Sequence, residues 1–157
     1  MNKPLALFDI DKTIFDGWSY FVLVKAHIAE GLLKQSVLTR AEETIDRYER
    51  HELDYELMVK ELLTIYAHGL QGKSAVLVRR STQAVFASTT DFFAYAAPTI
   101  AHLKQTHEIV FVTGSAQFTA EAVGRAFGVS HFLSTEPEPP SLHPSGASRT
   151  FFALELS

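Results

Sequence analysis

The stretch LALFDIDKTI, residues 5–14, is the part of this sequence that decides its fold. Residues 5–8 form a continuous apolar run, which is typical of a strand buried on both faces of a parallel sheet. Asp9 and Asp11 come directly after this run, and open α/β sheets bind their ligands at the carboxyl ends of their strands. The stretch therefore predicts an α/β fold with a polar site immediately after the first strand.

The two carboxylates are spaced for joint chemistry. Asp9 and Asp11 are two residues apart and are followed by the hydroxyl of Thr13. On an extended chain, residues i and i+2 point the same way, so one carboxylate can attack an electrophile while the other transfers a proton. Both are also hard oxygen ligands of the kind that Mg²⁺ accepts together with substrate phosphate. Asp9 and Asp11 are therefore candidate catalytic residues and candidate metal ligands.

Two other interpretations of this stretch have to be weighed. A short Asp-rich turn is often only a solvated loop, but the apolar run before Asp9 argues against an exposed loop. A calcium loop would also begin with alternating oxygen ligands. Such a loop needs Gly at its sixth position and Glu at its twelfth, where this chain has Ile14 and Tyr20.

The rest of the chain alternates between helical and strand patterns. From residue 17 to about residue 90, apolar residues recur at three- and four-residue steps, which predicts a small helical bundle. Residues 109–112 form a second apolar strand, residues 116–127 have the pattern of a helix, and residues 131–134 suit a short third strand. After residue 136 the composition changes to a stretch rich in Pro and Ser.

A second constellation follows the second strand. Thr113, Gly114 and Ser115 lie between that strand and the next helix. A hydroxyl, free backbone N–H groups and a helix N-terminus converge there, which suits a phosphate group, and Gly lets the backbone approach closely. Taken alone, the same junction is only a well-capped helix start.

Together the two constellations resemble motifs I and II of the haloacid dehalogenase-like (HAD) hydrolase superfamily. Its phosphoserine-phosphatase-like subfamily inserts a helical cap between these motifs, and Asp16-Gly17 follows motif I here as it does there. The resemblance covers residues 5 to about 136. It implies a Rossmannoid three-layer α/β core with a parallel sheet, plus an inserted helical-bundle cap. The expected division is core 1–14 and 98–136, cap 15–97, and an irregular tail 137–157.

The resemblance also implies a mechanism and roles for the site residues. Asp9 would attack phosphorus and form an aspartyl-phosphate, while Asp11 would protonate the leaving oxygen and then activate water. The expected reaction is Mg²⁺-dependent hydrolysis of a small phosphorylated metabolite, with phosphotransfer and dehalogenation as lesser alternatives. The residues expected to bind phosphate or support the loop around it are Thr13, Thr113, Gly114 and Ser115.

This chain departs from the family pattern in its second half. The family has a Lys in motif III and one or two Asp residues in motif IV, whereas the last Lys here is Lys104 and the last Asp is Asp91. Removing one preorganised charge commonly costs about 10²–10³ in rate, and Mg²⁺ is expected to bind weakly. The alternative is therefore an inactive, truncated pseudo-phosphatase that at most binds a phosphorylated ligand. A frameshift or premature end near residue 136 would explain the change, and it would leave the first strand as an uncovered apolar edge.

The amino-acid composition excludes several functional classes of protein. The chain has 157 residues, 46% of them hydrophobic and 20% charged, and its net charge is −4 from 14 basic and 18 acidic residues. A mildly acidic chain has no general electrostatic affinity for nucleic acid, and no apolar run approaches a membrane span. The absence of cysteine and of a signal-peptide pattern leads us to expect a cytoplasmic protein. The oligomeric state is not predicted.

Several further patterns have ordinary interpretations. Residues 69–74, GLQGKS, hint at a phosphate-binding loop, but the first Gly is misplaced and no strand precedes it. Trp18 and its neighbours are expected to pack the cap rather than line a pocket. Lys25, Arg47 and Arg50 are candidates to meet a substrate anion, although no signal selects one of them. The charged stretch 40–56 is expected to be a solvated helix face.

Overall fold

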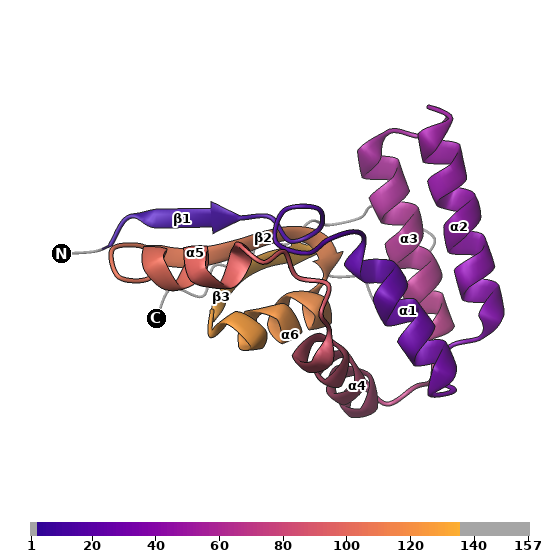
Figure 1. Ribbon diagram of the computed structural model, residues 1–157. Coiled ribbons are helices and arrows are strands. Elements are labelled where there is room, and N and C mark those ends of the chain that lie inside the picture. Colours follow the sequence, from indigo (N-terminus) through magenta and orange to yellow (C-terminus); the bar gives the residue numbers. More distant parts are fainter. Residues whose placement is uncertain (1–2, 136–157) are drawn as a thin grey trace, which may run out of the picture.

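A computed structural model describes residues 3–135 of the chain. The predicted tail 137–157 lies outside the described residues. The elements follow one another in the order β1 (Leu5–Phe8), α1 (Ser19–Ala29), α2 (Gln35–Glu49), α3 (Tyr55–Gly69), α4 (Ala75–Ser88), α5 (Ala96–Leu103), β2 (Glu108–Ala116), α6 (Gln117–Phe127) and β3 (His131–Thr135) (Figure 1). The predicted α/β class with an inserted set of helices is confirmed.

The three strands form one parallel sheet in the order β1-β2-β3. Ala6 pairs with Ile109, and Phe111 pairs with both Phe8 and Phe132, so these side chains share one face. β2 continues past the predicted end of the second strand, with a shift of register between Val112 and Ala116. The sequence pattern predicted only the apolar part of β2, because the polar residues that follow carry no strand signal.

One face of the sheet packs against the core, and α5 and α6 cover it. Its residues are buried or packed against the buried cluster, whereas Leu5 and Leu7 point the other way and are 61% and 63% exposed. Within residues 3–135, β1 pairs with β2 alone. For these residues, the predicted uncovered apolar edge is therefore present, and the face of β1 that carries Leu5 and Leu7 is open.

The helices begin and end where local signals favour it. The side chain of Asp54 accepts a hydrogen bond from the N–H of Leu57 at 2.8 Å and caps α3, and Ser74 caps α4 in the same way. Gly128 ends α6 in the left-handed conformation, with φ of 61°. The stretch 69–74 is thus the end of α3, a turn and the cap of α4, as its ordinary interpretation predicted.

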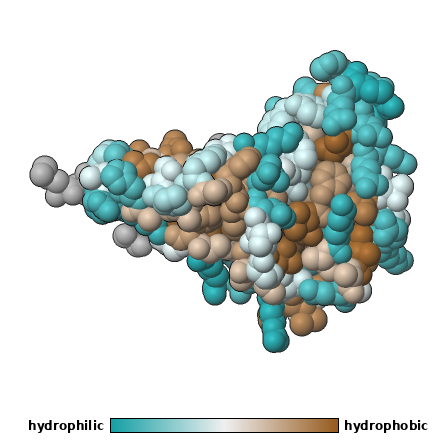
Figure 2. Space-filling model, viewed as in Figure 1, coloured by the Kyte–Doolittle hydropathy of each residue, from teal (hydrophilic) through white to brown (hydrophobic). Residues whose placement is uncertain are grey.

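The inserted helices do not all stay together. α2 packs against α3, and both lie beyond the sheet together with α1, whereas α4 packs both against α1 and against α6 of the core (Figure 1). Arg79 of α4 and Glu121 of α6 form an ion pair at 2.9 Å. The outer side formed by α2 is hydrophilic (Figure 2), which agrees with the solvated face predicted for residues 40–56.

A series of aromatic contacts ties the inserted helices to the sheet. The ring centroids of Phe15 and Phe92 are 5.5 Å apart, and those of Phe92 and Phe127 are 4.8 Å apart. Phe15 also contacts Phe86 of α4, and Phe127 contacts Phe111 of β2, both at 6.0 Å and edge to face. Such pairs contribute about 0.5–1.5 kcal/mol each beyond the area they bury. These packed rings therefore hold the loop after β1, which contains Phe15, against the rest of the core.

None of the helices in the described part of the chain is both long and apolar enough to cross a membrane.

Candidate active site

The loop after β1 is a tight turn anchored by buried side chains. The carbonyl of Ile10 accepts hydrogen bonds from the N–H groups of Ile14 at 3.0 Å and Phe15 at 2.9 Å, and all three side chains are buried. Asp9 and Asp11 flank Ile10 on either side, so its burial directs both carboxylates away from the core. The predicted polar site at the end of the first strand therefore rests on an apolar base.

Lys12 lies at the tightest point of this turn. Its φ is 60°, a left-handed conformation that favours glycine. The Lys12 ammonium lies 4.2 Å from the centroid of the Trp18 ring, a cation–π contact. The side chain is thus directed to the cap and not to the two carboxylates.

Asp9 is exposed, and one of its two carboxylate oxygens accepts a hydrogen bond. The Thr13 hydroxyl donates a hydrogen bond to Oδ2 of Asp9 at 3.1 Å. The Tyr95 hydroxyl, directly before α5, donates to the backbone carbonyl of Thr13. Tyr95 therefore holds Thr13 in place, and Thr13 in turn orients Asp9. This leaves Oδ1 of Asp9 open to a ligand at the carboxyl end of the sheet.

Both carboxylate oxygens of Asp11 accept hydrogen bonds, and the side chain is half-buried. Its Oδ1 accepts the backbone N–H of Ser19 at 2.6 Å, and its Oδ2 accepts the Ser115 hydroxyl at 3.1 Å. The two serine hydroxyl oxygens are 3.4 Å apart. This one carboxylate therefore joins the loop after β1, the start of α1 and the end of β2.

The pKa of Asp11 is raised above its ordinary value. Burial is the main cause, and the negative charge of Asp9 adds to it. The hydrogen bonds from Ser19 and Ser115 act in the opposite direction but do not outweigh burial. Two carboxylates in one site thus have different environments, which is how acid and nucleophile roles are separated.

The predicted phosphate residues lie at the end of β2. The N–H of Ser115 donates to Oγ1 of Thr113 at 3.0 Å, so this N–H is already paired, while the Thr113 O–H is still able to donate. Gly114 lies under α3, because a Cβ added there would be 3.4 Å from Cγ1 of Val59 and 3.5 Å from the Tyr55 hydroxyl. The structure thus places Thr113, Gly114 and Ser115 beside Asp11 and beneath the cap.

Sequence reasoning missed two residues at this site. Ser19, whose N–H holds Asp11, begins α1 directly after Gly17-Trp18, and a Ser at a helix start was the available signal. Tyr55 follows the cap residue Asp54 at the start of α3. No sequence spacing indicates which cap residue lies above Gly114.

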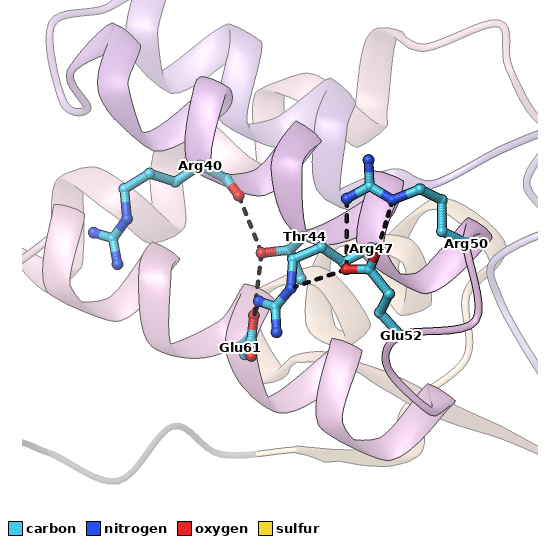
Figure 3. Close-up of polar contacts among 6 residues, drawn as sticks. All are labelled: Arg40, Thr44, Arg47, Arg50, Glu52 and Glu61. Atoms are coloured by element: carbon cyan, nitrogen blue, oxygen red, sulfur yellow. Dashed lines mark hydrogen bonds and ion pairs between the residues drawn. The ribbon is translucent and has the colours of Figure 1, made fainter.

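The cap arginines are used within the cap. Figure 3 shows that Arg47 and Thr44 both point to Glu61, and that Arg50 points to Glu52. The Arg47–Glu61 and Arg50–Glu52 ion pairs are 2.9 and 2.8 Å long. These pairs are partly exposed and add little stability, but they occupy the guanidinium groups considered as substrate anchors.

Lys104 is also engaged elsewhere, and Lys25 is exposed. The Lys104 ammonium donates to the carbonyls of Phe127 and Gly128 and joins the end of α5 to the end of α6. Lys25 is exposed on α1. In the part of the chain that the structure describes, no Lys or Arg forms an ion pair with Asp9 or Asp11.

The carboxylate pair fits a metal ion only in part. Among residues 3–135 there is no cluster of three or more His, Asp or Glu side chains that would hold a metal by itself. Mg²⁺, however, usually takes one or two carboxylates and completes its shell with phosphate oxygens and water. The open oxygen of Asp9 and the backbone carbonyl of Asp11 are oxygen donors of this kind, so these two residues fit Mg²⁺ together with a bound phosphate.

Fold and site together define a capped α/β domain in which a pair of carboxylates lies beneath inserted helices. A family model described as haloacid dehalogenase-like hydrolase matches residues 6–147. The chain therefore belongs to the HAD hydrolase family, as the two motifs predicted. A search of the curated proteins found no match.

Solved structures show the same fold. A protein of unknown function from Bordetella pertussis Tohama I has a TM-score of 0.69 and 24% identity over 88% of this chain and 62% of its own. A phosphoserine phosphatase, solved as a phospho-aspartyl intermediate analogue, has a TM-score of 0.56 and 15% identity over 87% of this chain and 57% of its own. A phosphoserine phosphohydrolase-like protein from Francisella tularensis subsp. tularensis SCHU S4 has a TM-score of 0.56 and 12% identity over 84% of this chain and 57% of its own. This chain thus spans 57–62% of the length of these relatives.

Proposed function

We propose that this chain is a Mg²⁺-dependent phosphomonoesterase that acts on a small phosphorylated metabolite through a covalent intermediate on Asp9. The contrast between the two carboxylates carries the proposal. Asp9 is exposed and has an open oxygen, whereas Asp11 is half-buried, has a raised pKa and is held by two donors. Membership of a hydrolase family supports it.

In the first step, an Asp9 carboxylate oxygen attacks phosphorus. The P–O bond to the leaving alcohol breaks as the Asp9–phosphorus bond forms, and protonated Asp11 gives its proton to the leaving oxygen. In the second step, Asp11 takes a proton from water, which attacks phosphorus and releases phosphate and Asp9. A raised pKa suits Asp11 to this role, because the acid must hold its proton until the leaving oxygen needs it.

The end of β2 would hold the phosphoryl group. We assign the Thr113 O–H and the Gly114 N–H as donors to its oxygens. Ser115 acts mainly through Asp11, because its N–H is paired with Thr113 and its hydroxyl with Asp11. Thr13 contributes by orienting Asp9.

Asp9 and the backbone carbonyl of Asp11 would hold Mg²⁺ with phosphate oxygens and water. When bound, the ion would neutralise the negative charge that Asp9 and a phosphate bring together. The mildly acidic composition favours a small soluble substrate over nucleic acid. We also propose a cytoplasmic location, on the basis of the cysteine-free composition.

A second function is phosphate-ligand binding without turnover. It is favoured by the absence of any Lys after Lys104 and of any Asp after Asp91 in the sequence. Lys12 and Lys104 are also engaged away from the carboxylate pair. In this second case the site would bind a phosphorylated ligand but would lack the charges that stabilise the transition state.

Hydrolysis of p-nitrophenyl phosphate with and without Mg²⁺ separates the two functions. We expect Mg²⁺-dependent turnover that falls by at least about 10²-fold in Asp9→Asn, because the amide is not a nucleophile. Asp16→Asn is the matched control, since Asp16 is an exposed carboxylate in the same loop, and it should keep wild-type turnover. Equal rates for wild type and Asp9→Asn would overturn the phosphatase and leave the binding function.

A further inference from the structure

The start of α3 overhangs the end of β2. Tyr55 and Val59 are one helical turn apart on α3, and both lie above Gly114. The Tyr55 hydroxyl oxygen is 3.5 Å from the point where a Cβ of Gly114 would be. A cap side chain therefore reaches the backbone that is proposed to hold the phosphoryl group.

The Tyr55 hydroxyl lies in the field of both carboxylates. Its pKa is raised by burial first, and then by the negative charges of Asp9 and Asp11. The hydroxyl consequently stays protonated and can donate at neutral pH. A neutral donor is the kind of group that can meet a phosphate here without adding negative charge.

This donor is free. Within residues 3–135, the hydroxyls of Tyr20, Tyr66 and Tyr95 are hydrogen-bonded, whereas those of Tyr55 and Tyr48 have no partner, and of these two only Tyr55 lies above Gly114. Tyr55 is 53% exposed, so a ligand can reach it. Its ring packs edge to face on Tyr48, with centroids 6.4 Å apart, which fixes the direction of the hydroxyl.

We propose that Tyr55 is a substrate-binding residue whose hydroxyl donates a hydrogen bond to an oxygen of the phosphate ester, opposite Asp9 and above Gly114. This inference rests on the proposed function and adds a contact from the cap. It couples the position of α3 to the phosphoryl group, so that the cap takes part in recognising the phosphate itself. Hydrogen bonds to charged groups of this kind correspond to about 10- to 100-fold in affinity or rate.

Tyr55→Phe tests the proposal, because it keeps the ring contact and removes only the hydroxyl. We expect kcat/KM for p-nitrophenyl phosphate to fall by about 10- to 100-fold, with an unchanged melting temperature. Tyr48→Phe removes the hydroxyl of the neighbouring ring and should stay close to wild type. Equal kcat/KM for Tyr55→Phe and wild type, or equal losses in both variants, would overturn the assignment.

Binding of orthovanadate, a phosphate analogue, separates this inference from the proposed function. If wild-type turnover does not exceed that of Asp9→Asn, the phosphatase proposal fails, and the vanadate Kd then decides the role of Tyr55. A Kd weakened by about 10-fold or more in Tyr55→Phe, with Tyr48→Phe unchanged, would support the contact. An unchanged Kd, or no saturable vanadate binding by wild type, would overturn it.

Discussion

Asp9 and Asp11 receive different environments from the same short loop. The open oxygen of Asp9 faces solvent, while both oxygens of Asp11 accept hydrogen bonds from Ser19 and Ser115. Burial nevertheless dominates at Asp11, because its pKa is raised and not lowered. An ionised Asp11 is thus a destabilising feature of the fold.

Replacing Asp11 should stabilise the fold. Because the folded pKa of Asp11 lies above the unfolded value of 3.8, the folded state binds more protons between the two values, and stability falls as pH rises through that window. Asp11→Asn removes this cost, and its amide can still accept from the Ser19 N–H and donate to the Ser115 hydroxyl. We expect the free energy of unfolding at pH 7 to rise by about 0.5–2 kcal/mol in urea titrations.

The same titrations at pH 4 and pH 7 supply the control. The gain should shrink at pH 4, where Asp11 of the wild type holds its proton more often. Asp16→Asn, in the exposed part of the loop, should show no such gain. A loss of stability in Asp11→Asn at pH 7 would show that the hydrogen bonds outweigh burial.

At the residue scale, the position of a side chain was predictable where the signal is local. Asp9, Asp11 and Thr13 could be predicted because five consecutive residues at a strand end carry the pattern. Ser19 and Tyr55 could not, since their places depend on how α1 and α3 pack over the loop. Contacts across many residues of sequence leave no periodic signal in one chain.

At the scale of elements, α3 and α2 approach closely at one glycine. Gly69 is in the last turn of α3, and a Cβ there would be 2.7 Å from Cδ2 of Leu33 and 2.8 Å from Cγ2 of Val37. Leu33 can move the end of its side chain, but the β-branched Val37 is stiff on its helix. Val37 is therefore the residue that requires glycine at this position.

Gly69→Ala should destabilise the protein although Ala is the better helix former. Overpacking costs about 1–3 kcal/mol, which exceeds the gain of about 1 kcal/mol in helix propensity. In a Val37→Ala background the same change should become neutral or stabilising, because the obstructing methyl groups are gone. Urea unfolding of the four proteins in this double-mutant cycle measures the difference. The same ΔΔG in both backgrounds would contradict the packing explanation.

Helix boundaries were predictable, but helix partners were not. Asp54, Ser74 and Gly128 mark boundaries through interactions with backbone groups a few residues away. The position of α4 was not predictable, because its apolar stripe would fit the other cap helices or, as observed, α6. An amphipathic pattern indicates that a face is buried and does not indicate its neighbour.

At the scale of the whole molecule, the sheet determines where the site lies. Three parallel strands end on one side, and the inserted helices lie beyond that end (Figure 1). The apolar run of β1 predicted burial on both faces, whereas within residues 3–135 Leu5 and Leu7 are exposed. A strand with one paired side and apolar residues on an open face is prone to pair with other chains.

Chemical trapping of the phosphorylated residue tests the central claim most directly. The full chain is mixed with p-nitrophenyl phosphate and Mg²⁺, quenched in acid, reduced with borohydride and analysed by peptide mass spectrometry. Borohydride reduces an acyl phosphate to the alcohol, so the account predicts a homoserine at position 9, with Asp11 and Asp16 unmodified. Reduction at a different aspartate, or an unmodified Asp9, would contradict it.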